Sequence, residues 1–182
     1  MTRNPLSPTD SLSEALYTAY ADSPLGLLMI RASNQAIIEL LPVSRKAQEI
    51  RENSLTRQCR KELSQYFAGK RKNFTLPLRP RGTPFQEKIW TVLQTIPYGC
   101  TMTYKEIAEK AGSPKAVRAA GTACGKNPLP ILIPCHRVIG SNGSLTGYAF
   151  GLPAKKYLLL LEKNGIAPKD TGKVLFSWQE KQ

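Results

Sequence analysis

The chain has 182 residues and a formal net charge of +13, because 26 Lys and Arg stand against 13 Asp and Glu. Such an excess makes small acidic molecules an insufficient explanation and favours a polyanionic partner, either a nucleic acid or an anionic membrane surface. Hydrophobic residues make up 41% of the chain, which excludes intrinsic disorder, and apolar runs such as residues 158–161 are far shorter than the roughly 18 residues that span a bilayer.

The first third of the chain predicts a small α/β unit. Residues 1–13 are polar and have no apolar stretch of signal-peptide type, so we expect a disordered tail and a cytoplasmic protein without a membrane partner. Strand-like patterns follow at residues 17–21, 25–31 and 36–41, with Ser23-Pro24 and Ser33-Asn34 as turns between them. Residues 44–67 favour a basic helix that ends at Gly69.

A change in composition at residues 79–82 marks a linker between an N-terminal domain over residues 14–79 and a second domain over residues 80–166. After the linker, Thr83 is a predicted helix cap with Pro84 at the first helical position. Apolar residues then recur at helical spacing, namely Phe85, Ile89, Val92, Leu93 and Ile96. Residues 167–182 are expected to form a C-terminal tail.

Two short helices follow in a pattern that suggests a helix-turn-helix. Thr103 and Glu106 fit a capping box, Gly112 ends the first helix, and Ser113-Pro114 is expected to open the second. The second helix has one apolar face and one exposed face, the latter with Lys115, Arg118, Ala119 and Thr122. An ordinary helical hairpin has the same pattern, and the net charge of the chain favours DNA. The small side chains suit close, sequence-tolerant approach better than base reading.

The segment Asn127–Arg137 contains a candidate nucleophile. Pro128, Pro130 and Pro134 restrict the backbone, and Pro134 favours an extended chain around Cys135. His136 follows directly, and on an extended chain the two side chains point apart, so a bridging water is a plausible relay. Neighbouring cations are expected to lower the pKa of the Cys135 thiol from its usual value of about 8.5. A buried structural cysteine beside an ordinary histidine is the alternative.

The other cysteines indicate neither a disulfide scaffold nor a metal site. No C-x-x-C pair links the four residues Cys59, Cys100, Cys124 and Cys135, and no secretory signal accompanies them. A structural zinc site needs four ligands, and the chain has a single histidine. We therefore expect reduced thiols and no bound metal.

The string Pro134-Cys135-His136-Arg137-Val138 resembles the active-site segment of the O6-alkylguanine-DNA alkyltransferases, or methylated-DNA–protein-cysteine methyltransferases. The resemblance runs from Gly82 to Gly165 and includes Asn127-Pro128 and the helices that carry Tyr104 and Arg118. It implies an α+β fold, with a small mixed α/β domain of ribonuclease H-like type followed by a mostly helical, winged-helix-like domain that holds the helix-turn-helix.

The resemblance also implies a reaction. The protein would bind duplex DNA bearing O6-alkylguanine, and also O4-alkylthymine, as a monomer and without a cofactor. It would flip the damaged base out of the stack and transfer the alkyl group irreversibly to Cys135, once per molecule. His136 would accept the thiol proton through water, Glu162 would orient His136, and Tyr104 would donate a proton to the departing guanine. Asn127 would brace the nucleophile segment.

Further residues are implied as contacts of the DNA and of the base. Arg118 would fill the space of the extruded base, and other DNA contacts would come from Tyr104, Lys105, Ser113, Lys115, Ala119, Thr122 and Ser141. The base pocket would be lined by Cys124, Val138, Tyr148, Ala149 and Phe150. Phe150 would restrict the size of the alkyl group, because its ring competes for volume near the thiol.

Three other functions fit parts of this pattern. A sequence-specific regulator would need base-reading side chains and a dimerisation element, and neither is evident. A cysteine hydrolase would use the same Cys135 and His136 but would turn over an ester. A non-catalytic, alkyltransferase-like damage binder would replace the nucleophile, and the presence of Cys135 argues against it.

Overall fold

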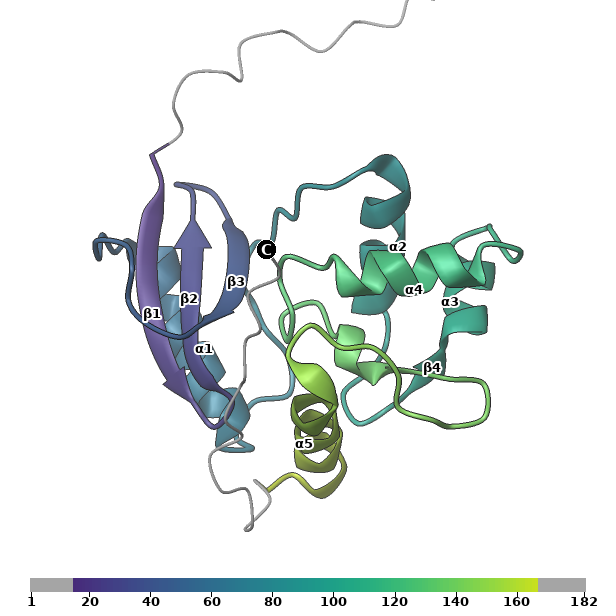
Figure 1. Ribbon diagram of the computed structural model, residues 1–182. Helices are drawn as coiled ribbons and strands as arrows, with labels where there is room; N and C mark the ends of the chain where they lie inside the picture. The colour runs from purple at the N-terminus through teal and green to yellow at the C-terminus, as the bar shows by residue number, and fades with distance from the viewer. Residues whose placement is uncertain (1–14, 167–182) are drawn as a thin grey trace, which may run out of the picture.

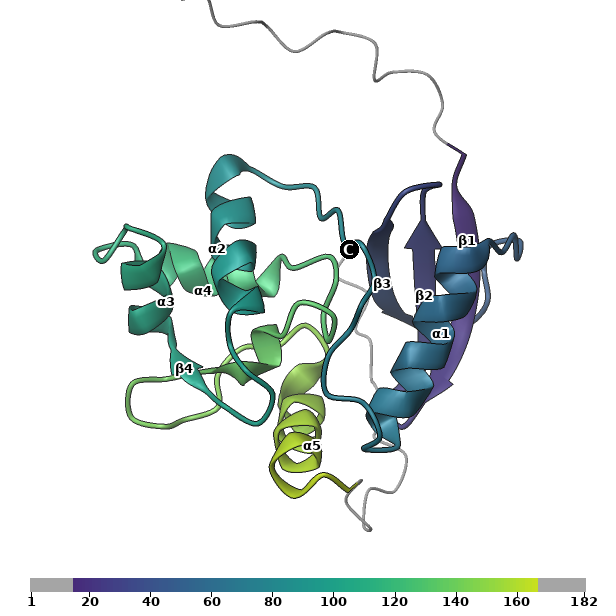
Figure 2. The ribbon, with the colours of Figure 1, turned by 180° about the vertical axis from the view of Figure 1, so that it is seen from behind.

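The computed structural model describes residues 15–166, and the two predicted tails fall outside this range. A three-stranded antiparallel sheet, formed by β1 (Tyr17–Ser23), β2 (Gly26–Ala32) and β3 (Ile37–Val43), has the strand order β1-β2-β3. Ser23 pairs with Gly26, so a two-residue turn joins the first two strands, and the predicted strands and turns are confirmed. Helix α1 (Ser54–Phe67) covers one face of this sheet (Figures 1 and 2).

The helix predicted over residues 44–67 begins ten residues later than expected. Asn53 caps α1 through a capping box with Thr56, which fixes the start of the helix at Ser54. Upstream of the cap, the chain runs beside β1 instead, where Thr18 and Arg51 exchange two backbone hydrogen bonds of 2.8 and 3.0 Å. Pairing with a sheet edge therefore overrides the local helical pattern.

The second half of the described chain is mostly helical and lies beside the sheet (Figure 1). It contains α2 (Pro84–Gln94), α3 (Tyr104–Lys110), α4 (Val117–Gly125) and α5 (Gly151–Asn164). The short strands β4 (Met102–Thr103) and β5 (Val138–Ile139) pair in parallel, and a 3₁₀ turn, η1 (Cys135–Arg137), precedes β5. The predicted α+β class is confirmed.

Local capping signals place the helices that surround the site. Thr83 caps α2 next to Pro84, and Thr103 forms a capping box with Glu106, both as predicted. Thr83 also forms a capping box with Gln86, which was not predicted. The expected start of the next helix is wrong: the amide of Ala116 bonds to the carbonyl of Ser113 in a turn, and α4 begins at Val117. The turn uses the Ser113-Pro114 pair before the helix starts.

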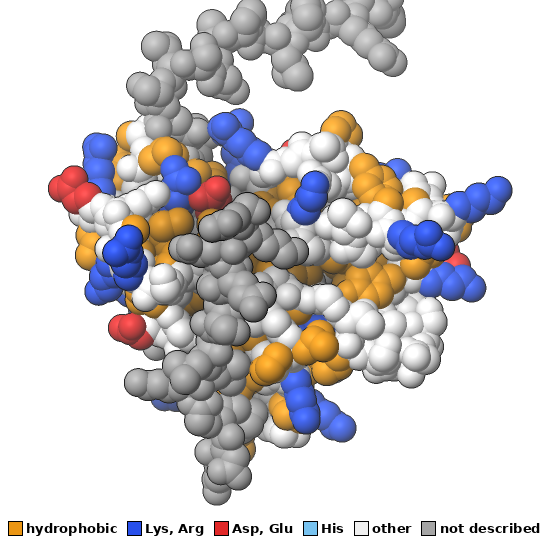
Figure 3. Space-filling model, viewed as in Figure 1, with side chains coloured by type: hydrophobic (Ala, Val, Ile, Leu, Met, Phe, Trp, Pro, Cys, Tyr) orange, Lys and Arg blue, Asp and Glu red, His pale blue; other side chains and the backbone are white. Residues whose placement is uncertain are grey.

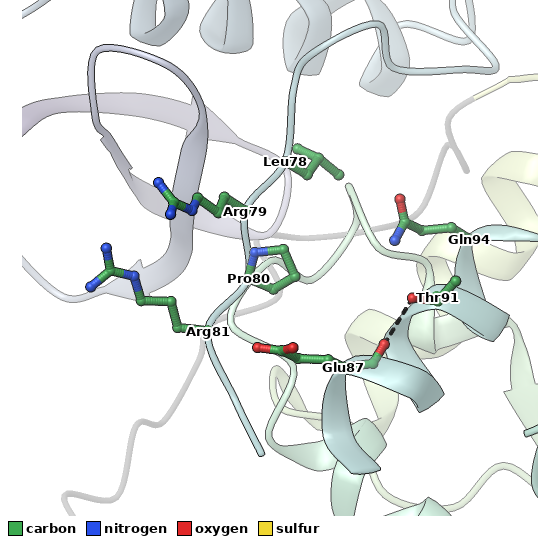
Figure 4. Close-up of a pocket in the computed structure, with 7 residues that line it drawn as sticks. All are labelled: Leu78, Arg79, Pro80, Arg81, Glu87, Thr91 and Gln94. Atoms are coloured by element: carbon green, nitrogen blue, oxygen red, sulfur yellow. Dashed lines mark hydrogen bonds between the residues drawn. The ribbon is translucent and has the colours of Figure 1, made fainter. Parts of the chain in front are cut away.

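The linker between the two domains packs against both β3 and α2. It starts at the outer edge of β3, where the amide of Arg79 donates a 2.9 Å hydrogen bond to the carbonyl of Ile37 and the amide of Ile37 donates one of 2.9 Å to the carbonyl of Pro77. A cavity of about 660 Å³ opens between the linker and α2 (Figure 4), lined by Leu78, Arg79, Pro80, Arg81, Glu87, Thr91 and Gln94. At Gly82 a Cβ atom would lie 2.5 Å from the Trp90 ring, so glycine is required for the ring to pack there.

Trp90 forms part of the core that joins α2 to α4. Its ring is 1% exposed, and its indole nitrogen donates a 2.9 Å hydrogen bond to the carbonyl of Ala123. No helix among residues 15–166 is both long and apolar enough to cross a membrane.

Candidate active site

The segment that carries Cys135 is a tight turn and not the extended chain that the prolines suggested. Cys135–Arg137 form one turn of 3₁₀ helix, and Pro134 occupies the cap position. Upstream, Ile131 has a φ of +75°, the one positive value among the non-glycine residues described. Proline restricts the residue before it and opens a helical turn readily, so Pro134 ends the loop and begins the turn.

Asn127 braces this turn from the end of α4. Its side-chain amide donates a 2.8 Å hydrogen bond to the carbonyl of Ile133 and a 3.2 Å hydrogen bond to the sulfur of Cys135. Its side-chain oxygen accepts from the amide of Leu129 at 3.0 Å. The Asn127 side chain is nearly fully buried and thus fixes both the loop and the sulfur.

Cys135 is a buried thiol in this structure. Burial raises the pKa of its thiol to about 11, although the hydrogen bond from Asn127 and the positive charge of Lys155 act in the opposite direction. The sequence-based expectation of a lowered pKa is therefore wrong. The adjacent cation Arg137 points to a carboxylate instead, and His136 is held in its neutral form by burial, which lowers its pKa. A base is needed to generate the thiolate.

Glu162 is the centre of the buried polar network. Its carboxylate accepts from Nε2 of His136 at 2.8 Å, and Arg137 donates to it through Nε and Nη2, both at 2.9 Å. The Tyr66 hydroxyl at 2.7 Å and the Gly99 amide at 2.9 Å are further donors. Its hydrogen bonds to His136 and Arg137 hold the pKa of Glu162 well below its usual value despite burial.

The network determines which nitrogen of His136 carries the proton. An ionised carboxylate can only accept, so the hydrogen of the neutral ring lies on Nε2, which faces Glu162. Nδ1 is then the basic nitrogen. Among the residues that the structure describes, Nδ1 is buried and has no hydrogen-bond partner. The ring is fully buried and belongs to the same turn as Cys135.

Tyr104 and Lys155 meet at a single carbonyl group. The Tyr104 hydroxyl donates to the carbonyl of Thr146 at 3.0 Å, and Nζ of Lys155 donates to the same oxygen at 2.7 Å. The Lys155 amine lies 5.7 Å from the centroid of the Tyr104 ring. Lys155 is fully buried, and desolvation lowers the pKa of its amine. Its charge lies close enough to Cys135 to favour the thiolate.

Sequence reasoning missed three of these residues. Lys155 lies two helical turns before Glu162 on α5, and this spacing on one face was a usable signal. Arg137 was interpreted only as a neighbouring cation. Tyr66 belongs to the other domain and has no sequence signal, because its hydrogen-bond partner lies 96 residues away.

The predicted base-pocket residues lie around this site with different exposure. Val138 is buried on β5, and Cys124 is buried on α4, where desolvation raises the pKa of its thiol to about 12. The Tyr148 ring lies 6.3 Å from His136, and the Phe150 ring, 3% exposed, lies 5.4 Å from that of Tyr148. Ala149 is exposed.

Most of the predicted DNA contacts are exposed. Arg118, Ala119 and Thr122 form the exposed face of α4, Lys115 is exposed in the turn before it, and Ser113 is half-buried. Lys105 is exposed on α3, where it lies 3.9 Å from Glu109. Ser141 lies in the exposed loop after β5. In Figure 3 Lys and Arg side chains lie on the side of the molecule formed by α3 and α4 and also on the opposite side, over the N-terminal sheet.

Two family models match nearly the whole described chain. Residues 16–80 match the model for the 6-O-methylguanine DNA methyltransferase, ribonuclease-like domain, and residues 84–164 match that for the DNA binding domain of the same proteins. A methylated-DNA–protein-cysteine methyltransferase of Methanosarcina barkeri is 43% identical over 157 residues, which cover 83% of this chain and 99% of that protein.

A second relative and a solved structure are similar to this chain over most of its length. The constitutive methylated-DNA–protein-cysteine methyltransferase of Bacillus subtilis is 43% identical and is matched over 81% of this chain and 95% of its own length. Among solved structures, Mycobacterium tuberculosis OGT in complex with DNA superposes with a TM-score of 0.77 at 39% identity. That match covers 86% of this chain and 97% of the other chain.

Proposed function

This chain belongs to the family of methylated-DNA–protein-cysteine methyltransferases, and from that premise we propose that Cys135 is the cysteine that receives the alkyl group. The protein is a DNA-repair alkyltransferase that removes the alkyl group from O6 of guanine. The observation that carries the assignment of Cys135 is the buried chain of contacts from Asn127 to Cys135 and from His136 to Glu162.

The reaction begins with the thiol proton. A water molecule between the Cys135 sulfur and Nδ1 of His136 passes this proton to the imidazole, and Glu162 stabilises the imidazolium that forms. The positive charge of Lys155 favours the thiolate, which the buried site otherwise disfavours. The thiolate sulfur attacks the alkyl carbon in line with the bond to O6. A sulfur–carbon bond forms, the carbon–oxygen bond breaks, and its electron pair stays on guanine.

Tyr104 supplies a proton to the departing guanine. Its hydroxyl donates to the carbonyl of Thr146 in this structure, and Lys155 donates to the same oxygen. When the base enters, Lys155 keeps that carbonyl satisfied while the Tyr104 hydroxyl turns to guanine. In the overall balance guanine gains the proton that the thiol loses. The product on Cys135 is a thioether, which the site has no means to hydrolyse, so each molecule acts once.

Access to O6 requires the damaged base to leave the duplex. A stacked and paired guanine hides the alkyl carbon from a buried thiol, and extrusion costs a few kcal/mol. The exposed face of α4 supports close approach to DNA because Ala119 and Thr122 are small, and Arg118 has the length to enter the space that the base leaves. O4-alkylthymine presents the same alkyl–oxygen bond and is a second substrate.

We further propose that the protein works in the cytoplasm and is attracted to DNA by its charge. All four cysteines are free thiols, which suits the reducing cytoplasm. We propose that the protein acts as a monomer. The net charge of +13 supplies a long-range attraction to duplex DNA.

Incubation with a duplex that contains O6-methylguanine should raise the intact mass of the protein by one methylene group, because a methyl replaces the thiol hydrogen. Peptide mapping should place that mass on Cys135, and the yield should saturate at one group per molecule. A duplex with plain guanine is the control. Modification of Cys124 instead, or continued turnover after saturation, would contradict the assignment.

Replacement of Arg118 by alanine should slow repair of duplex DNA by about tenfold or more, because the extruded state loses the side chain that fills the stack. Reaction with the free base O6-methylguanine should change little, since no duplex has to open. The measurement is the second-order rate constant on both substrates. The control is Lys126→Ala, which removes one positive charge at the other end of α4. An equal decrease of the duplex rate constant in the two variants would show that Arg118 acts only through its charge.

A further inference from the structure

Helix α1 of the N-terminal domain reaches the polar network of the active site through one hydroxyl group. The Tyr66 side chain donates to Oε1 of Glu162 at 2.7 Å, and Nε2 of His136 contacts the same oxygen at 2.8 Å. Nη2 of Arg137 is the third donor to that atom, at 2.9 Å. Tyr66 therefore shares a single acceptor atom with the residue that acts as the base.

The position of this hydroxyl is fixed by packing from both domains. Tyr66 is fully buried, and its ring lies 5.5 Å from Phe67 and 5.4 Å from Phe74 in its own domain. On the other side, the Tyr98 ring lies 6.2 Å away in an edge-to-face arrangement. Tyr98 in turn lies under the Arg137 guanidinium, at 5.8 Å. The aromatic cluster thus sets the distance between α1 and the carboxylate.

We propose that Tyr66 is a positioning residue for alkyl transfer, which holds Oε1 of Glu162 in place and moderates how strongly that oxygen accepts from His136. This inference extends the proposed function, because it concerns the basicity of Nδ1 of His136. It gives the ribonuclease-like domain a direct part in the chemistry, in addition to its packing role. A backbone hydrogen bond of 2.9 Å from Leu40 to the carbonyl of Pro128 connects the same domain to the loop before the nucleophile.

The physical basis is competition for the negative charge of one oxygen. Three donors share Oε1, and each of them draws on the same lone pairs. When the phenol is removed, more negative charge is available to the hydrogen on Nε2. The imidazolium form of His136 then becomes more stable, and the pKa of His136 rises from its lowered value.

Other charged or titratable groups face this pair and stay in place when Tyr66 is changed. Two cations, Arg137 on η1 and Lys155 on α5, lower the pKa of His136. Burial and the Glu162 charge raise the pKa of the nearby phenols of Tyr98 and Tyr148. Because these contributions are common to the wild type and the variant, a change in the titration of His136 isolates the Tyr66 hydroxyl.

The test uses Tyr66→Phe in the full, untagged chain, since phenylalanine keeps the aromatic packing. His136 is the one histidine of the sequence, so ¹⁵N-histidine NMR reports on it without assignment. In the wild type we expect the neutral ring to carry its proton on Nε2. In the variant the pKa of His136 should rise by about 0.5 to 1 unit. The matched control is Tyr157→Phe, which removes a buried α5 hydroxyl that has no partner among the described residues.

The rate of alkyl transfer provides the second readout. A higher pKa leaves more of His136 protonated at a given pH, so the loss of activity on the acidic side should begin at higher pH in Tyr66→Phe. The rate above that region should fall several-fold, because Oε1 of Glu162 is no longer held in place to orient His136. Affinity for duplex DNA should not change. Tyr157→Phe should follow the wild-type profile.

Three results would overturn the proposal. The first is a His136 titration in Tyr66→Phe that superimposes on the wild type, and the second is an equal shift in Tyr157→Phe. The third needs no variant: wild-type protein with the neutral proton on Nδ1. Failure of the function itself would differ from all three, because it would appear as no alkyl group on Cys135 in the wild type, whatever the NMR titration gives.

Discussion

Replacement of Cys135 by serine should abolish alkyl transfer and leave the affinity for duplex DNA nearly unchanged. A hydroxyl is a far weaker nucleophile than a thiolate, and its proton is much harder to remove at neutral pH. Serine is close in size to cysteine and can accept the same hydrogen bond from Asn127. The nucleophile turn should therefore keep its form.

The measurement is the yield of transferred methyl groups, with DNA affinity determined by titration of a fluorescent duplex. Cys124→Ser is the matched control, since it removes the second buried thiol of the region. It should transfer at close to the wild-type rate. Stoichiometric transfer by Cys135→Ser would show that another residue is the acceptor, and a large loss of DNA affinity would show that the change disturbs more than the chemistry.

Replacement of Glu162 by glutamine should reduce both stability and activity. All five groups that contact the carboxylate are hydrogen-bond donors. Glutamine replaces one of the two acceptor oxygens with an NH2 group, which cannot accept a hydrogen bond from them. The Arg137 guanidinium would also stay buried without its counter-charge. Loss of one partner of a buried ion pair costs about 3 kcal/mol or more.

The activity loss in Glu162→Gln should exceed what the stability loss explains. A glutamine amide that donates to Nε2 of His136 would move the ring proton to Nδ1 and remove the base. We expect alkyl transfer to slow by about a hundredfold or more. Chemical unfolding measures the stability, and the ¹⁵N shifts of the single histidine report the tautomer. Wild-type activity with an unchanged tautomer would exclude the orienting role of Glu162.

The same variant should change the response to acid. The pKa of Glu162 is lowered in the folded protein, so its ionised form contributes stability that is fully present above its unfolded value of about 4.3. That contribution is lost as the pH falls through the folded pKa. Glutamine does not titrate, so the free energy of unfolding of Glu162→Gln should decline less steeply below about pH 4.

Features that depend on neighbouring residues in the chain could be predicted before the fold was known. The capping boxes at Thr83 and Thr103 fix two helix starts with residues only three positions apart. Strand alternation and turn residues predicted the three-stranded sheet. The string from Pro134 to Val138 indicated the nucleophile because it resembles the active-site segment of the alkyltransferase family.

The protonation state of Cys135 and the hydrogen-bond partners of Glu162 depend on the three-dimensional fold. The pKa of Cys135 depends on burial, which no neighbouring residue reveals, and burial outweighs the nearby cations. Arg51 pairs with Thr18 at the edge of β1, and this pairing competes with a helix that the local pattern favoured. Glu162 takes its donors from α1, from the loop after α2 and from η1. A buried carboxylate must gather enough donors to offset its desolvation, and packing alone brings such distant segments together.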